Sequence, residues 1–153
     1  HIKRNSFKRK CGNMRNLKKF EEFVKSGIVK KQNQDKERAK SIILEADDKL
    51  KFFEKLKEKL GFKELSPNYV VETCYDILIE LIRAKLLLVG YKTDSHEAEV
   101  SYLRHLGFAE SDVLFMNQLR YFRNGIKYYG KNFDGEYAQK VENFLYKSLK
   151  KLK

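Results

Sequence analysis

A stretch of cationic and aromatic residues in the last third of the chain, LRYFRNGIKYYGK, contains the side chains best suited to chemistry. Arg120, Arg123 and Lys127 are separated by three and four residues, so a helix places them on one face. Asn124 and Tyr128 are four residues apart and lie beside that face. Guanidinium forks and phenol rings suit phosphates and stacked bases, as in the recognition of single-stranded RNA. The simpler interpretation is that the cations form the solvated side of an amphipathic helix.

The apolar residues of this region predict the helix that positions these groups. They recur at steps of three and four from Phe115 to Tyr129, which predicts a helix from about Glu110 to Tyr129 that Gly130 ends. Gly125 lies in its middle and costs about 1 kcal/mol relative to alanine. Such a glycine often marks a close backbone approach or a local distortion.

The same spacing predicts further helices over residues 15–26, 35–60, 67–89, 95–106 and 135–150. The helix at 67–89 is apolar on most of its circumference, so we expect it at the centre of the fold. Ser66 and Pro67 are expected as its N-cap and first residue, and Asp94 with Glu97 as a capping box for the helix at 95–106. Glycines are expected to end the predicted helices, at positions 27, 61, 90, 107 and 130.

No alternating pattern is long enough to predict a strand. The chain is therefore expected to be all-α, an antiparallel helical bundle of four to six helices. We expect residues 1–33 to form a basic N-terminal leader with a short helix, and residues 34–153 to form a single helical-bundle domain. The chain begins with His1, and Met14 is an alternative start; if translation begins there, residues 1–13 are an appended basic leader.

Composition narrows the class of protein further. The 153 residues include 33 Lys+Arg and 21 Asp+Glu, a net charge of +12 that favours a polyanionic partner. Most of this excess lies in the first 65 residues, where a solvated basic arm is the simpler explanation. Cys11 and Cys74 cannot form a disulfide framework, and with three histidines they give no zinc-binding spacing, so no metal or cofactor is predicted. Cysteine usage and the lack of a membrane span lead us to expect a cytoplasmic protein.

The order of these segments resembles a known family. A long charged helix, an apolar helix ending in LLLVGYK, then TDSHEAEVSYLRHLGF and LRYFRNGIKYYGK, is similar to the HEPN family (higher eukaryotes and prokaryotes nucleotide-binding), particularly to its small stand-alone archaeal members. The similarity spans roughly residues 35–150. It implies a compact antiparallel bundle that pairs as a symmetric homodimer, and in many members a metal-independent endoribonuclease.

The resemblance also implies which residues form the site. Its Arg-polar-x-x-x-His signature falls on Arg123 and Asn124, but Tyr128 stands at the histidine position. An imidazole titrates near neutral pH, whereas a phenol has a pKa of about 10, so Tyr128 is a poor base. The chain therefore keeps the groups that would bind RNA and lacks the one that would move a proton. His96 is the candidate to replace it, although a surface or cap histidine is the simpler interpretation.

Three functions follow. The first is RNA or nucleotide binding at the face that carries Arg120, Arg123, Asn124, Lys127 and Tyr128, with His96 nearby. The second is an active ribonuclease or toxin module with an altered site. The third is a protein-interaction role, for example as partner of a nucleotidyltransferase. We also expect Glu80 and Arg83, three residues apart, to form an ion pair with each other.

Overall fold

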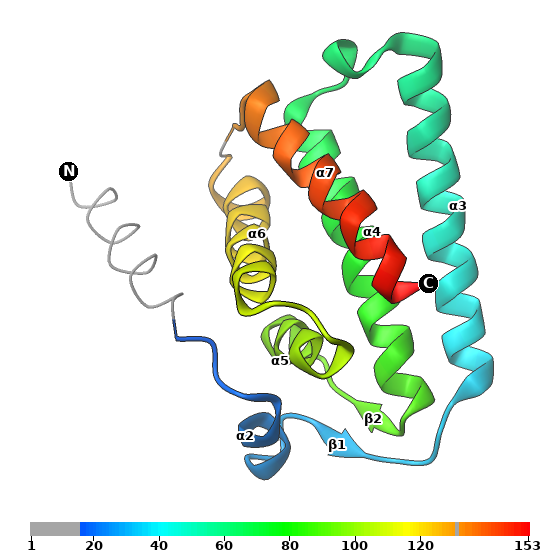
Figure 1. Cartoon of the computed structure of the whole chain (residues 1–153), viewed down its shortest axis with the longest axis vertical. Coiled ribbons are helices and arrows are strands. Elements are labelled where there is room, and N and C mark those ends of the chain that lie inside the picture. Colours follow the sequence, from blue (N-terminus) through cyan, green and yellow to red (C-terminus); the bar gives the residue numbers. More distant parts are fainter. Residues whose placement is uncertain (1–15, 131) are drawn as a thin grey trace.

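Helix α4 (Pro67–Leu88) lies at the centre of an all-α bundle (Figure 1). The computed structural model describes residues 16–130 and 132–153, and for residues 127–129 it describes the backbone only. Most of α4 is buried, from Val70 to Leu87, and it packs against α3 (Lys36–Leu60), α5 (His96–Ser101), α6 (Glu110–Tyr129) and α7 (Gly135–Leu152). The predicted all-α class and the central position of this helix are confirmed.

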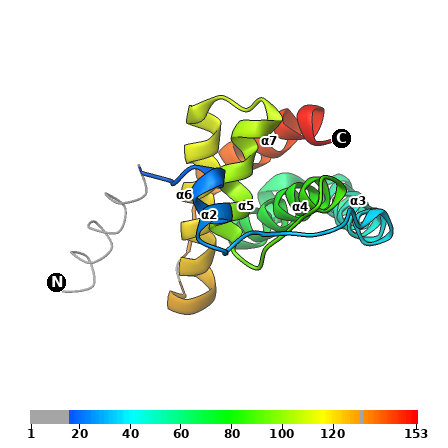
Figure 2. The ribbon, with the colours of Figure 1, turned by 90° about the horizontal axis from the view of Figure 1, so that it is seen from below.

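Helices α3 and α7 both pack along α4, and α6 crosses it. Figure 1 shows α3 and α4 side by side and antiparallel, joined at one end through the short 3-10 helix η1 (Phe62–Glu64). In Figure 2 these two helices are seen nearly end-on, whereas α6 is seen along its side, so α6 crosses α4 steeply. α7 returns along α4 and buries Val141 and Leu145 in the shared core. The crossing brings the middle of α6 over one side of α4.

The predicted ends of the helices are largely confirmed. Asp35 caps α3, since its carboxylate accepts a hydrogen bond from the Arg38 amide at 3.0 Å, and Pro67 begins α4 after Ser66. The Ser66 side chain makes no capping hydrogen bond. Glycines follow the helix ends as expected, all five with positive φ, at positions 27, 61, 90, 107 and 130. Gly125 is buried, and α6 continues through it to Tyr129.

The predicted helix at 95–106 is wrong in two respects. It is a short α-helix, α5, followed by a separate 3-10 helix, η2 (Tyr102–Leu106). Its N-cap is Ser95, whose hydroxyl accepts a hydrogen bond from the Ala98 amide at 3.1 Å, so the expected capping box of Asp94 and Glu97 does not form. Ser95 can take this position because Thr93 Oγ1 accepts a hydrogen bond from its amide at 3.1 Å and fixes the preceding turn.

The segment before α3 packs on the bundle. Helix α2 (Phe20–Lys25) starts later than predicted, and it buries Phe20 and Phe23 against Leu86 of α4 and Ala98 of α5. After α2, β1 (Lys30–Lys31) pairs antiparallel with β2 (Tyr91–Lys92) in a short ladder. No strand was predicted here, because two residues are too few to show an alternating pattern. No helix among the described residues is long and apolar enough to cross a membrane.

Gly90 is the residue that allows this ladder to form directly after α4. Its φ is +84°, and a Cβ at this position would lie 2.6 Å from the backbone oxygen of Gln32. The Gln32 amide donates a hydrogen bond to the Gly90 carbonyl at 2.9 Å. Only glycine combines this backbone angle with so close an approach. The chain can therefore turn from α4 into β2 and lead on to α5, which carries His96.

Candidate functional site

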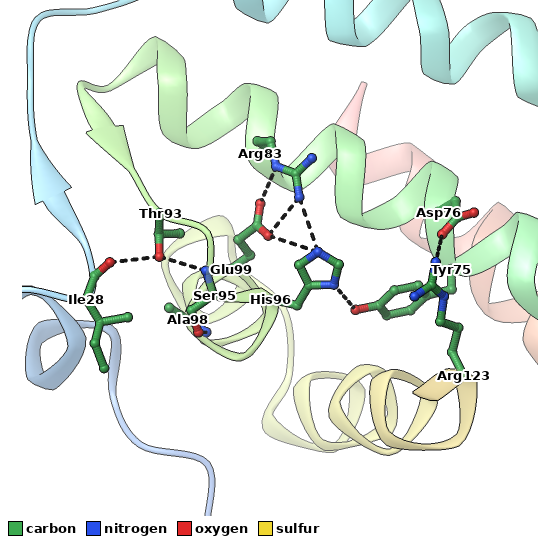
Figure 3. Close-up of polar contacts among 10 residues, drawn as sticks. All are labelled: Ile28, Tyr75, Asp76, Arg83, Thr93, Ser95, His96, Ala98, Glu99 and Arg123. Carbon is green, nitrogen blue, oxygen red and sulfur yellow. Dashed lines mark hydrogen bonds and ion pairs between the residues drawn. The ribbon is translucent and has the colours of Figure 1, made fainter. Parts of the chain in front are cut away.

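One of the cations predicted on α6, Arg123, is directed toward α4. Arg123 is 19% exposed, and its Nη2 lies 3.4 Å from Oδ1 of Asp76 on α4. Its guanidinium carbon lies 5.6 Å from the centre of the Tyr75 ring, a cation–π distance. Its Nε is buried and has no hydrogen-bond partner. The Arg123 side chain is therefore held against α4 by one long ion pair and one ring contact (Figure 3). These contacts leave some of its N–H groups without a hydrogen bond.

Arg120 lies one turn before Arg123 and has no carboxylate partner among the described residues. Its Nε donates a hydrogen bond to Oδ1 of Asn117 at 3.0 Å. Asn117 is 98% buried and was not predicted from the sequence. The positive charge of Arg120 acts on Tyr75 and His96, which places all three groups within electrostatic range of one another. Of the two arginines described on this side of α6, Arg120 is thus the one without a carboxylate partner.

His96, at the start of α5, lies on the same side of α4. Its Nδ1 is 3.0 Å from the Tyr75 hydroxyl, and its Nε2 is 3.4 Å from Nη2 of Arg83 (Figure 3). Because a guanidinium can only donate, the second contact requires a lone pair on Nε2 and assigns the imidazole proton to Nδ1. The His96 side chain is 37% exposed. It is therefore a half-buried, hydrogen-bonded histidine and not a simple surface or cap residue.

The surroundings of His96 favour its neutral form. Burial lowers the pKa of His96, and the positive charges of Arg83, Arg123 and Arg120 lower it further, while Asp76 acts in the opposite direction. Burial also raises the pKa of Tyr75, so its hydroxyl stays protonated. At neutral pH the pair is an uncharged imidazole bonded to an uncharged phenol.

Arg83 is held by a carboxylate other than the predicted one. Its Nε and Nη2 donate to the two oxygens of Glu99 at 2.9 and 3.1 Å, and the Glu99 side chain is fully buried. Burial raises the pKa of Glu99, and the hydrogen bonds from Arg83 oppose that rise. Glu80 pairs instead with Lys49 of α3. The expected Glu80–Arg83 pair is wrong, because each side chain pairs with a residue of a neighbouring helix, Glu80 with Lys49 of α3 and Arg83 with Glu99 of α5.

These contacts define one group of side chains at the junction of α4, α5 and α6, which we call the arginine–histidine cluster: Tyr75, Asp76, Arg83, His96, Glu99, Arg120 and Arg123. It contains three guanidinium groups, two carboxylates and one imidazole. Asn124 adjoins it on α6, is half-buried and makes no hydrogen bond to a described residue. The side chains of Lys127 and Tyr128 lie outside the described residues. The cluster offers donors for an anion and one group that could accept a proton.

The structure gives no indication of a metal centre. Within residues 16–130 and 132–153, no group of three or more histidine, cysteine and acidic side chains could hold a metal ion. Cys74 is buried in the core, and burial raises the pKa of its thiol to about 12. Cys11 lies outside the described residues.

Sequence reasoning missed the members of the cluster on α4. Asp76 and Arg83 are seven residues apart, which places them two turns apart on one side of a helix that is otherwise mostly apolar. That spacing is the signal that could have located them. Glu99 and Tyr75 give no such signal, because their partners lie on other helices.

Comparison of the chain with protein-family models, with curated proteins and with solved structures finds no match.

Proposed function

We propose that the protein binds RNA through the arginine–histidine cluster and the adjoining surface of α6. The observation that supports this most strongly is the convergence of three guanidinium groups on one imidazole, with only two carboxylates to balance them. One positive charge is left in excess when His96 is neutral. A half-buried group of donors with excess positive charge is typical of sites that bind phosphate.

Arg123 and Arg120 can contact a phosphate with little rearrangement. Arg123 makes one ion pair, with Asp76 at 3.4 Å, which is long for a charge-assisted hydrogen bond. Arg120 makes its hydrogen bond to an uncharged amide. A phosphate oxygen would offer both side chains a stronger acceptor than the one each has now. Asn124, Lys127 and Tyr128 would extend the same surface along α6.

A fluorescein-labelled oligouridylate of about 20 nucleotides tests this proposal by fluorescence anisotropy. We expect binding that weakens between 50 and 200 mM salt, and an Arg123→Gln variant with lower affinity and a log Kd–log salt slope that is lower by about one. Lys51→Gln is the matched control, because this substitution also removes one positive charge and Lys51 is an exposed residue of α3. Equal loss of affinity in the two variants, or binding that does not depend on salt, would contradict the proposal.

RNA cleavage is a second candidate function, and the position of His96 is the observation that favours it. Tyr128 is a poor base, but the neutral imidazole of His96, once its Nε2 is released from the long contact with Arg83, could accept the proton of a ribose 2′-hydroxyl. That hydroxyl attacks the adjacent phosphate and displaces the 5′-oxygen, to which the imidazolium then returns the proton. Wild-type protein would then cleave the same oligonucleotide without added metal, and His96→Gln would not, while still binding it. Intact RNA after hours with the wild type between pH 6 and 9 excludes cleavage but leaves the binding proposal standing.

The resemblance to the HEPN family, the homodimer and the nucleotidyltransferase partner remain predictions. A symmetric dimer would place two arginine–histidine clusters in one assembly. Sedimentation equilibrium of the purified protein tests the dimer directly.

A further inference from the structure

A separate cavity lies between the start of α3, the end of α4, β2 and the start of α5. Its volume is about 220 Å³, which limits an occupant to a small molecule. Its outer lining has two exposed cations, one exposed carboxylate and apolar and aromatic surface: Arg38, Leu87, Tyr91, Lys92 and Asp94. On the inner side it meets the arginine–histidine cluster at Arg83, His96 and Glu99, where the buried Glu99 carboxylate already pairs with Arg83.

The cations of this cavity are available to a ligand. The side chains of Arg38 and Lys92 are exposed, and neither forms an ion pair or hydrogen bond with a described residue. Arg83 uses Nε and Nη2 for Glu99 and His96, which leaves Nη1 without a partner. Three donor groups from two helices and a strand thus surround one space. A phosphate group, which accepts several charge-assisted hydrogen bonds at once, fits such a set of donors.

The rest of the lining indicates what the phosphate would be attached to. Leu87 and Tyr91 provide apolar and aromatic contact for a carbon skeleton, which inorganic phosphate lacks. The carboxylate of Asp94 can only accept hydrogen bonds, so it suits hydroxyl groups on that skeleton and disfavours a second anionic group near it. A phosphorylated sugar combines these features, whether it is free or part of a nucleotide.

The cavity is built into the fold and is not a chance gap between side chains. Gly90 sets the direction of β2, the ladder with β1 holds Tyr91 and Lys92, and the Thr93 hydroxyl donates to the Ile28 carbonyl at 2.9 Å (Figure 3). On the other wall, the Asp35 amide donates to the Leu87 carbonyl at 3.1 Å and fixes the start of α3, which carries Arg38. Its walls are therefore fixed before any ligand enters.

We propose that this cavity binds a sugar phosphate through Arg38, Arg83 and Lys92. The proposal can be tested apart from RNA binding, because Arg38 and Lys92 lie outside the arginine–histidine cluster, although Arg83 belongs to both sites. Isothermal titration calorimetry with inorganic phosphate, ribose 5-phosphate and AMP at constant ionic strength tests it. We expect both organic phosphates to bind at least tenfold more tightly than inorganic phosphate, and a comparison of the two shows whether the base adds affinity.

Variants connect that binding to the cavity. Arg38→Gln combined with Lys92→Gln is expected to weaken ribose 5-phosphate binding at least tenfold with an unchanged circular dichroism spectrum, because both side chains are exposed. Lys51→Gln combined with Lys55→Gln removes the same charge from the exposed far half of α3 and is expected to have little effect. The proposal is overturned if organic phosphates bind no better than inorganic phosphate, or if the two double variants lose affinity equally.

Discussion

Arg83 and Glu99 join α4 to α5 through two hydrogen bonds of 2.9 and 3.1 Å, in which one guanidinium faces one fully buried carboxylate. This pair also places Nη2 of Arg83 beside Nε2 of His96. The orientation of His96 therefore depends on an ion pair between two residues that are not neighbours in the sequence.

Arg83→Met is expected to destabilise the protein by about 3 kcal/mol, because it leaves the Glu99 carboxylate buried without a partner. Replacing both residues by methionine is expected to recover most of that loss, since no buried charge then remains. Urea denaturation followed by circular dichroism measures both free energies of unfolding. A double variant that is less stable than Arg83→Met would show that Glu99 has another essential partner.

The lowered pKa of His96 predicts how stability depends on pH. An unfolded histidine has a pKa of about 6.5, so between pH 7 and pH 5 the unfolded chain takes up a proton that folded His96 resists. Its contribution to stability is therefore full above pH 7 and falls as the pH decreases. The free energy of unfolding should decrease less toward pH 5 in His96→Asn than in the wild type.

His105 provides the control for this experiment. Its Nε2 lies 2.6 Å from Oε1 of Glu21, and it lies outside the arginine–histidine cluster. His105→Gln leaves the surroundings of His96 unchanged and should therefore keep the loss of stability toward pH 5 that His96 causes. If His96→Asn and the wild type show the same pH dependence, the assignment of a neutral folded His96 is wrong.

Asp76 competes with any phosphate for Arg123. Asp76→Asn removes the negative charge 3.4 Å from Nη2 of Arg123 and is expected to tighten binding of the labelled oligouridylate several-fold. Asp112→Asn is a suitable control on α6, because Asp112 pairs with Lys147 of α7 and not with the cluster. Weaker binding by Asp76→Asn would mean that the ion pair orients Arg123 for the ligand.

Gly90→Ala tests the turn after α4. The variant combines a φ of +84° with a contact of 2.6 Å to the Gln32 oxygen, so we expect a loss of 2 kcal/mol or more, on the order of the cost of a strained backbone. Gly61→Ala has a nearly identical φ of +83° but no atom within 4 Å of the added carbon, so it measures the backbone strain alone. In thermal unfolding, the Tm of Gly90→Ala should be well below that of Gly61→Ala. Equal losses would exclude the steric contribution.

The fold was predictable because its signals are local. Apolar spacing located the long helices, Pro67 and the glycines gave their ends, and the apolar circumference of the 67–89 helix identified the core. The candidate site was only half predictable: Arg120 and Arg123 were singled out from residue type and spacing, and His96 from the segment that carries the family resemblance. Asp76, Arg83 and Glu99 were not, because their roles depend on how α6 crosses α4 and how α5 begins. A Ser95 cap in place of Asp94 shifts α5 by one residue, which spacing arguments do not resolve.

Helix α4 supplies much of the interior of the bundle and, through Tyr75, Asp76 and Arg83, one wall of the arginine–histidine cluster. A substitution of a buried residue such as Ile79→Val therefore lies within one turn of Asp76 and Arg83. Under the proposed function, selection on ligand preference would act partly on the hydrophobic residues of this helix. Laboratory evolution of altered selectivity should accordingly include interior positions of α4 in its libraries.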